Sequence, residues 1–262
     1  MSETDGKAGV LSSLGRFFDV LEYLDTMPRE VSIRQVSEDL SINKATVYRI
    51  LKTMCERGYA YQNPDNKKYA LTLALFHIGF RVKNKMPVSQ LISPYYPMLD
   101  RLRDKYGESI NISMLDKHSR RHIRLTNIVS VKSDYMLRRI DRDISSMPAH
   151  ASASGKCLMA YAPKSFIDQF RGSKLETPTV FTIDNWNDLD EELRRIRENG
   201  YSVCTDEHEI GIACIAVPVI TEGNTVPASV SMSGETERMK EKDKIAVVSD
   251  LQILASQLAN VF

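Results

Sequence analysis

Residues 32–58, SIRQVSEDLSINKATVYRILKTMCERG, predict two short helices joined by a tight turn. The apolar positions of the second helix recur at i, i+3, i+4 and i+7 and are Val47, Ile50, Leu51 and Met54. A second set repeats this spacing two residues earlier, about 200° around the helix, and comprises Ala45, Tyr48, Arg49 and Lys52. One face of this helix therefore belongs to a core, and the other offers two cations, a phenol and a methyl group.

The ends of both helices are marked by capping residues. Ser32 followed by Gln35 is a capping-box pattern that opens the first helix. Asn43 is a favourable N-cap for the second helix, and Gly58 is a favourable C-cap just after Arg57. The few residues between the two helices leave only the short connection that a helix-turn-helix requires.

A hairpin is predicted directly after the second helix. The segment YAYQNPDNKKYAL reads as a strand, a turn at residues 63–66 and a return strand. Such a hairpin is a wing, and its lysines, Lys67 and Lys68, would face backbone phosphates. The alternative is an ordinary helical pair whose basic face is only solvated.

A cationic helix face beside a basic wing favours binding to a nucleic-acid duplex. We expect Arg49 and Lys44 to meet base edges or phosphates, Tyr48 to stack or bind a phosphate, and Ala45 to contact a thymine methyl group. The full set of candidate DNA-binding residues is Ser32, Arg34, Gln35, Asn43, Lys44, Ala45, Thr46, Tyr48, Arg49, Lys52, Lys67 and Lys68.

The charge distribution supports a basic module on a larger, nearly neutral body. Residues 31–86 hold 10 Lys and Arg against 4 Asp and Glu, whereas residues 87–262 hold 22 against 24. At 262 residues the chain is long enough for two domains. We expect a disordered segment at 1–12, a winged helix-turn-helix domain at 13–71, a linker helix at 72–86 and a second domain at 87–262.

Composition excludes several classes of protein. No apolar run approaches the ~20 residues of a membrane span, and no signal peptide opens the chain, so no membrane partner is expected. The four cysteines lack CxxC or zinc-like spacing, which indicates reduced thiols and a cytoplasmic location. The histidines, including His118, His122, His150 and His208, are scattered, so no metal and no cofactor is expected.

The remaining segments alternate between strands and helices. An apolar first helix runs from Ser12 or Ser13 to Met27, and two further helices are predicted at 72–86 and 88–106. Strands are predicted at 109–115, 122–129, 135–141, 201–204, 212–220 and 226–233, and helices at 152–162, 164–170, 187–199 and 239–260. Several antiparallel strands with segregated helices indicate an α+β sensor-like domain.

Seven motifs in this order resemble the IclR family of bacterial transcription regulators over nearly the whole chain. They are Ser13-Leu14, residues 43–49 (NKATVYR), residues 69–71 (YAL), residues 150–156 (HASASGK), Gly200-Tyr201, residues 211–219 (GIACIAVPV) and residues 231–234 (SMSG). The resemblance implies an α+β protein with an N-terminal winged helix-turn-helix and a C-terminal GAF-like effector-binding domain built on a central antiparallel sheet. It also implies a dimer or dimer of dimers on a palindromic operator.

The second domain carries residues suited to a small organic acid. The HASASGK segment leads into a helix whose first N–H groups attract anions, and Ser229, Ser231 and Ser233 share one strand face. An exposed, hydrated strand face is the alternative for these serines, and small core residues are the alternative for Cys157 and Cys214. Positions that match the family's effector site are Met147, Ala153, Ser154, Cys204, Ile212, Cys214, Ser231 and Ser233.

Two of these positions depart from the family pattern. Cys204 stands where some members that bind small keto acids carry an aspartate, and Ala153 replaces the loop glycine. The changed polarity argues against carrying over a glyoxylate-like ligand and leaves a bulkier or aromatic acid open. Ala45, where a serine is common, removes a hydrogen-bond donor and should alter the choice of DNA site.

Two other functions compete with effector sensing. A redox sensor would use Cys204 and Cys214, which lie ten residues apart on segments that can pair as adjacent strands. An enzyme is disfavoured because no nucleophile–base set, P-loop or Rossmann fingerprint occurs. Lys156 is expected to cap or pair locally rather than to catalyse.

Overall fold

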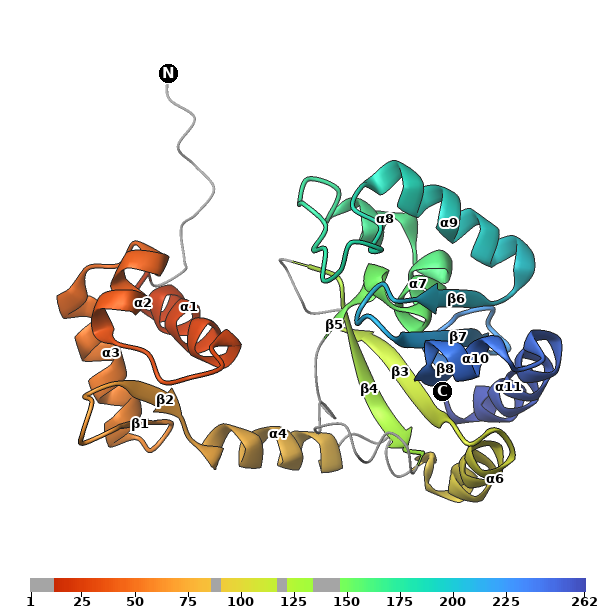
Figure 1. Cartoon of the computed structure of the whole chain (residues 1–262), viewed down its shortest axis with the longest axis horizontal. Helices are drawn as coiled ribbons and strands as arrows, with labels where there is room; N and C mark the ends of the chain where they lie inside the picture. Colours follow the sequence, from red (N-terminus) through yellow and green to blue (C-terminus); the bar gives the residue numbers. More distant parts are fainter. Residues whose placement is uncertain (1–11, 86–90, 117–121, 134–146) are drawn as a thin grey trace. The chain divides into compact units, whose positions relative to one another are not determined.

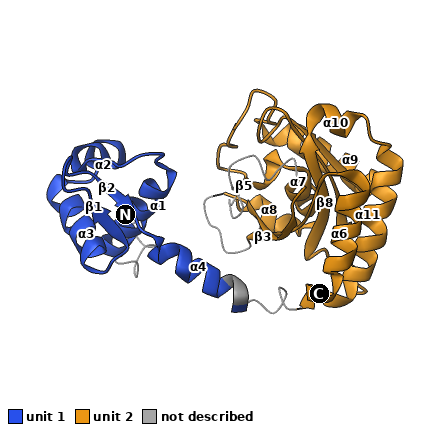
Figure 2. Cartoon of the chain, turned by 60° about the horizontal axis from the view of Figure 1, so that its bottom comes forward, with its two compact units in different colours: residues 1–85 blue, residues 86–262 orange. Residues whose placement is uncertain are grey.

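The computed structural model describes residues 12–85, 91–116, 122–133 and 147–262 (Figure 1). The chain separates into two compact units, residues 1–85 and residues 86–262, which Figure 2 colours separately. The strand predicted at 135–141 and His118 lie outside the described residues. In the part of the chain that is described, no helix is long and apolar enough to cross a membrane.

The first unit is a three-helix module followed by a hairpin and a long helix. Its elements are α1 (Ser12–Thr26), α2 (Ile33–Leu40), α3 (Lys44–Glu56), β1 (Ala60–Gln62), β2 (Tyr69–Leu71) and α4 (Leu73–Lys85). The Ser32 hydroxyl accepts a hydrogen bond from the N–H of Gln35 at 3.2 Å, and the Asn43 side chain accepts one from the N–H of Ala45 at 2.8 Å. Both predicted N-caps are therefore confirmed.

The predicted apolar stripe of α3 forms the centre of the first core. Val47, Leu51 and Met54 are buried against Val20 and Val36 from the other two helices. The hairpin of β1 and β2 pairs in antiparallel register, and Val31 exchanges backbone hydrogen bonds with Tyr69 at its edge. The first unit is thus a winged helix-turn-helix.

The second unit is built on a six-stranded antiparallel sheet of order β5-β4-β3-β8-β7-β6. Its strands are β3 (Ser109–Asp116), β4 (Arg124–Val131), β5 (Met147–Pro148), β6 (Ser202–Thr205), β7 (Ile212–Val219) and β8 (Ala228–Glu235). Its helices are α6 (Tyr96–Tyr106), α7 (Ala153–Tyr161), α8 (Lys164–Asp168), α9 (Trp186–Asn199), α10 (Thr236–Lys240) and α11 (Lys244–Leu258). Short 3₁₀ turns are η1 (Ser93–Tyr95), η3 (Ala149–Ala151) and η4 (Ala259–Val261).

The two faces of this sheet differ in chemistry because side chains alternate along each strand. Ile110, Ile112, Val230 and Met232 lie on one face and pack with α6 and α11 into the largest core. Small and polar residues occupy the opposite face, which α7 covers in Figure 1. This arrangement confirms the predicted α+β class with a central antiparallel sheet.

Two predicted helices differ from the structure. The single helix expected at 239–260 is divided into α10 and α11, because the Asp243 side chain accepts hydrogen bonds from the N–H groups of Ile245 and Ala246 and begins a new helix. Residues 88–90 of the helix expected at 88–106 lie outside the described residues, and its described part is interrupted by η1 before α6 begins at Tyr96. Pro94 and Pro97 lie at the starts of these two elements, where the missing proline N–H is tolerated.

We predict that Gly155→Ala destabilises the second unit by about 1–3 kcal/mol, as overpacking of a core does. A Cβ at Gly155 would lie 2.0 Å from the carbonyl oxygen of Ala149, which is backbone and cannot swing away. Gly172→Ala is the matched control, since nothing lies within 4 Å of its added Cβ. Urea unfolding of the two variants checks this, and equal midpoints would contradict the close approach.

Candidate nucleic-acid interface and ligand site

The outer face of α3 is open to solvent. Lys44, Ala45, Tyr48, Arg49 and Lys52 are exposed, with 47% of Tyr48 accessible. Lys52 lies 3.9 Å from Glu56, a long surface pair, and the described residues place no carboxylate against Lys44 or Arg49. The cationic side of the helix is therefore available to a polyanion.

The other predicted DNA-binding residues of the helix-turn-helix have local structural roles. The side chains of Ser32 and Asn43 are used as N-caps, and Arg34 forms an exposed ion pair with Glu38 at 2.7 Å. Gln35 is exposed in the first turn of α2, and Thr46 is half-buried in the first turn of α3. Because the side-chain oxygens of Ser32 and Asn43 accept helix N–H groups, these side chains are held in place by their own helices.

The wing presents both predicted lysines. Lys67 and Lys68 are exposed in the turn between β1 and β2, and Lys67 has the left-handed φ of 58°. The sequence interpretation missed Glu30, whose carboxylate accepts hydrogen bonds from Asn66, Tyr61 and Asn63. These bonds lower the pKa of Glu30 to about 2. The sequence signal that could have found Glu30 is its position directly before Val31, an apolar residue able to pair with the hairpin.

Six of the eight predicted effector residues gather around the first turn of α7. Ala153 contacts a cluster that contains Cys204 and Cys214. The Ser229 hydroxyl donates to the carbonyl of Ser154 at 3.4 Å, so α7 lies close over β8. Cys214 pairs directly with Ser233 across β7 and β8, and Ser231 is the next residue on that face.

The two remaining effector positions are on different strands. Met147 is in β5, at the opposite edge of the sheet from β6, and packs with the α7–α9 core rather than with the cysteines. Ile212 is the first residue of β7, half-buried and paired with Glu235. Met147 is therefore apart from the cysteines, whereas Ile212 is two residues before Cys214 and, because side chains alternate along a strand, lies on the same face of β7.

Strand pairing extends the polar face far beyond the predicted serines. Asn111 is opposite Ser231 on one side and Ser130 on the other, which makes a continuous polar row. Asn111 donates to Ser233 at 3.0 Å and accepts from Ser130 at 2.7 Å. The residues that sequence interpretation missed are Ser109, Asn111, Ser113, Asn127, Ser130 and Ser202. The polar–apolar alternation of residues 109–113 (SINIS) was the signal that could have found them.

The thiols near this site are protonated at neutral pH; Cys157 and Cys204 are buried, and Cys214 is half-buried. Burial raises the pKa of Cys214 to about 12, and it also raises the pKa values of Cys204 and Cys157. Cys204 donates a weak hydrogen bond to the carbonyl of Ala151 at 3.4 Å. A thiol rather than a thiolate therefore faces the first turn of α7, which makes it a poor nucleophile.

Lys156 forms a buried ion pair, as expected for a lysine with a local structural role. It is 1% exposed, and its ammonium lies 2.6 Å from the Glu207 carboxylate and 3.4 Å from Glu192. Burial alone would lower the pKa of Lys156, but Glu207 and the other acidic groups around it, Glu192 among them, together outweigh burial and the pKa is raised. The pair fixes α7 to the segment after β6.

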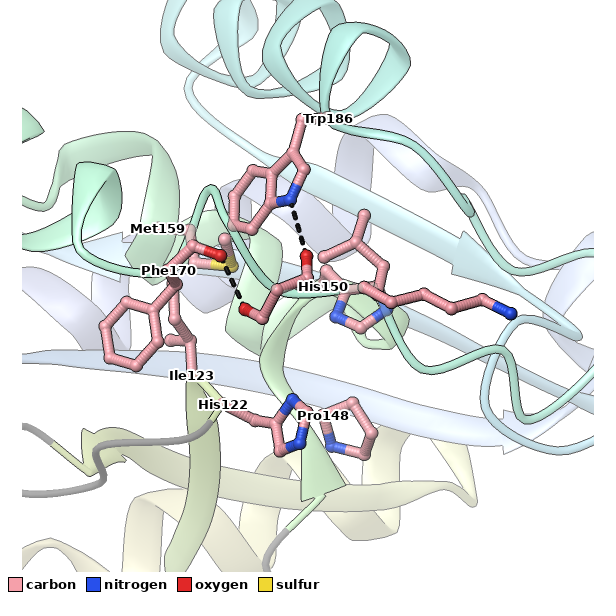
Figure 3. Close-up of a pocket in the computed structure, with 10 residues that line it drawn as sticks. His122, Ile123, Pro148, His150, Met159, Phe170 and Trp186 are labelled. Carbon is pink, nitrogen blue, oxygen red and sulfur yellow. Dashed lines mark hydrogen bonds between the residues drawn. The ribbon is translucent and has the colours of Figure 1, made fainter.

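A separate hollow lies between α7, β5 and the segment before α9 (Figure 3). Two of its polar groups are bonded within the chain. Trp186 Nε1 donates to the Ser173 carbonyl at 3.1 Å, a bond that Figure 3 marks. His150 Nε2 lies 2.7 Å from the Glu176 carbonyl. Burial lowers the pKa of His150. None of the eight predicted effector residues lines this hollow, and the described residues contain no group arranged to hold a metal ion.

A winged helix-turn-helix joined to an α+β domain is typical of transcription regulators that carry a DNA-binding domain and a ligand-binding domain in one chain. The family model described as "IclR helix-turn-helix domain" matches residues 13–64, and "Bacterial transcriptional regulator IclR C-terminal" matches residues 80–260. The chain belongs to the IclR family of DNA-binding transcription regulators. The relatives that it matches are transcription regulators and not enzymes.

Relatives match over almost their full lengths. The HTH-type transcriptional regulator KdgR of Escherichia coli is 31% identical over 98% of this chain and 95% of its own. KdgR of Dickeya chrysanthemi is 30% identical over 99% and 83%. A crystal structure of an IclR regulator from Alicyclobacillus acidocaldarius has a TM-score of 0.73 at 23% identity and covers 97% of this chain and 99% of that one.

We predict that Arg49→Ala weakens sequence-specific DNA binding by about 1–3 kcal/mol, the cost of losing a bidentate base contact. A gel-shift titration at fixed salt, on a duplex selected from random sequence, measures this change. Arg57→Ala is the matched control, because it removes the same charge from the far end of the helix. Equal affinities of the two variants would remove Arg49 from the base-reading set.

Proposed function

We propose that this regulator binds a palindromic operator as a homo-oligomer and senses a small organic acid with its second unit. The observation that carries the proposal is that one chain contains both features. The first unit has an exposed cationic face on α3, and the second unit has a polar sheet face that the start of α7 covers. Two copies of α3 would enter successive major grooves about 34–36 Å apart. Lys44, Arg49 and Tyr48 would meet bases and phosphates, and Lys67 and Lys68 would meet phosphates.

Exposed apolar side chains support self-association of the first unit. Leu14 and Phe18 protrude from α1, and α4 exposes Leu73, Phe76, Ile78, Phe80 and Val82. Leu73, Phe76 and Phe80 share one side of α4 and Ile78 and Val82 the other, and exposed apolar side chains in such numbers are favourable only when another surface covers them. A second copy of the chain is the partner that a palindromic operator requires, because a two-fold axis presents the same face twice.

The start of α7 supports an acidic ligand. Helix geometry leaves the N–H groups of Ala153 and Ser154 without intrahelical acceptors, and the positive end of the helix favours an anion. Cys204, Cys214, Ser231 and Ser233 surround this turn with thiols and hydroxyls, and Ile212, two residues before Cys214 on the same strand face, would supply apolar contact to the rest of the ligand. An IclR homologue from Microbacterium hydrocarbonoxydans was crystallised with 4-hydroxybenzoate, an acid of this general size.

We predict that a screen of small carboxylic acids finds one that stabilises the native protein. At 100 times its dissociation constant the acid adds about 2.7 kcal/mol to the free energy of unfolding. Ser231→Ala should lose most of this gain, whereas Ser256→Ala on α11 should keep it. Thermal-shift assays and operator titrations with and without the acid measure both effects. An acid that stabilises Ser231→Ala and the native protein equally would place the site elsewhere.

A second candidate function is redox sensing, favoured by one observation. Cys204 and Cys214 are directly opposite in the antiparallel pairing of β6 and β7. Both thiols would be oxidised to one disulfide, and hydrogen peroxide would take the two electrons and two protons and leave two water molecules. Burial opposes this function, because it raises the pKa of both thiols.

Redox sensing predicts that peroxide changes the operator affinity of the native protein but not of Cys214→Ser. Gel-shift titrations before and after oxidation measure this, with free thiols counted in parallel. Cys55→Ser is the control, since Cys55 lies in the first unit, away from the pair. Unchanged affinity of the oxidised native protein would reject the redox function and leave effector sensing standing.

A further inference from the structure

Glu30 is bonded to the wing from outside it. Its carboxylate accepts hydrogen bonds from Tyr61 Oη at 2.6 Å, from Asn63 Nδ2 at 2.9 and 3.0 Å, and from Asn66 Nδ2 at 2.7 Å. These partners are 31 to 36 residues further along the chain. Glu30 therefore joins the connection between α1 and α2 to both arms of the wing turn.

The two asparagines pass this connection on to the backbone of the turn. The side-chain oxygen of Asn63 accepts the N–H of Asp65 at 2.9 Å, and that of Asn66 accepts the N–H of Lys68 at 2.8 Å. Each asparagine amide thus donates to Glu30 and accepts from the turn. One carboxylate therefore holds two Asx turns at once.

Lys67 needs such support because its backbone is in the left-handed region. Its φ of 58° is uncommon for a residue with a side chain and is kept by the surrounding bonds. The N–H of Lys67 donates to the Asn63 carbonyl at 3.0 Å, and its carbonyl accepts from Gln62 at 3.0 Å. The conformation that directs the two wing lysines depends on the turn that Glu30 holds.

Glu30 also carries a negative charge on a surface expected to meet DNA. Hydrogen bonds from Asn66, Tyr61 and Asn63 hold its pKa at about 2, so it is ionised at neutral pH. By electrostatics alone, a carboxylate near phosphates lowers DNA affinity. The presence of Glu30 at the base of the wing is explained if fixing the positions of Lys67 and Lys68 increases DNA affinity by more than the repulsion of its carboxylate from the phosphates decreases it.

We propose that Glu30 is a positioning residue for DNA binding: it fixes the turn of residues 63–68 so that Lys67 and Lys68 meet the phosphate backbone. The inference rests on the proposed contact of these two lysines with DNA. An ordered turn presents its cations without the entropy loss of ordering a loop on binding. The carboxylate acts through the asparagines and does not itself touch DNA.

Opposite responses of two carboxylates test this proposal. Glu30→Gln and Asp65→Asn each remove one negative charge from the wing region, so simple electrostatics predicts tighter DNA binding for both. We expect Glu30→Gln to bind about tenfold more weakly at physiological salt, and the slope of log K against log salt to fall by about 1–2, as when one or two phosphate contacts are lost. Asp65→Asn should bind as tightly as the native protein or tighter.

Hydrogen exchange of the full-length protein without DNA gives an independent readout. Exchange in a peptide covering residues 59–71 should accelerate in Glu30→Gln, while peptides of α3 stay unchanged. Asn66→Ala, which breaks the link from Glu30 to the Lys68 N–H, should show the same two effects. Circular dichroism melts establish that each variant is folded, so a loss of DNA affinity is not a loss of fold.

The double variant Lys67→Ala/Lys68→Ala separates failure of this inference from failure of the proposed function. If the double variant binds DNA with native affinity and salt slope, the wing lysines do not contact DNA and both ideas fall. If it loses affinity while Glu30→Gln binds as tightly as Asp65→Asn, only the positioning role is wrong. Loss in both variants, with Asp65→Asn unaffected, supports the proposal.

Discussion

The opposite chemistry of the two faces of the central sheet governs the second unit. Along β3 and β8, Ile110, Ile112, Val230 and Met232 point into the core with α6 and α11, and the residues between them are small and polar. A helix can approach a face of small residues closely, and the Ser229 hydroxyl of β8 reaches the Ser154 carbonyl of α7 at 3.4 Å. The start of α7 therefore lies over hydroxyls and amides instead of over a packed apolar layer.

The first unit was largely predictable because its signals are local. N-caps at Ser32 and Asn43, an apolar stripe of period 3.6 and a turn rich in asparagine all act within a few residues, and each is confirmed. The ends of the long helices of the second unit were less predictable where an N-cap residue lies inside a continuous apolar pattern. Asp243 begins α11 within a stretch whose periodicity alone suggests one continuous helix.

Non-local pairing was the part that the sequence left undetermined. The alternation of residues 109–113 is visible in the sequence, but its place beside Ser231 depends on β3 pairing with β8, more than a hundred residues apart. Glu30 is a similar case: its hydrogen bonds to three wing residues become visible only when Val31 pairs with Tyr69. The resemblance supplied the serines of β8 because they lie in a motif, and it left out the asparagine opposite them.

A cation on the DNA-binding unit must be held in a fixed direction, and an anion that holds it also repels DNA. The outer face of α3 and the wing turn meet these two requirements in different ways. On α3 the helix itself fixes the direction of Arg49 and Lys44, so no anion is needed, and the described residues place none against them. Beyond β1 and β2 the wing turn is held by backbone hydrogen bonds from Asn63 to Lys68 and from Lys67 to Asn63 rather than by a helical ladder, and its conformation includes a lysine in the left-handed region. An acceptor with several lone pairs is the compact way to hold two asparagine amides and a phenol, and a carboxylate supplies it. The repulsion from one buttressed anion is screened over about 8 Å at physiological salt. The geometry that it gives to two neighbouring cations is not screened, so under this proposal a negative residue is tolerated at the base of a surface that would bind DNA.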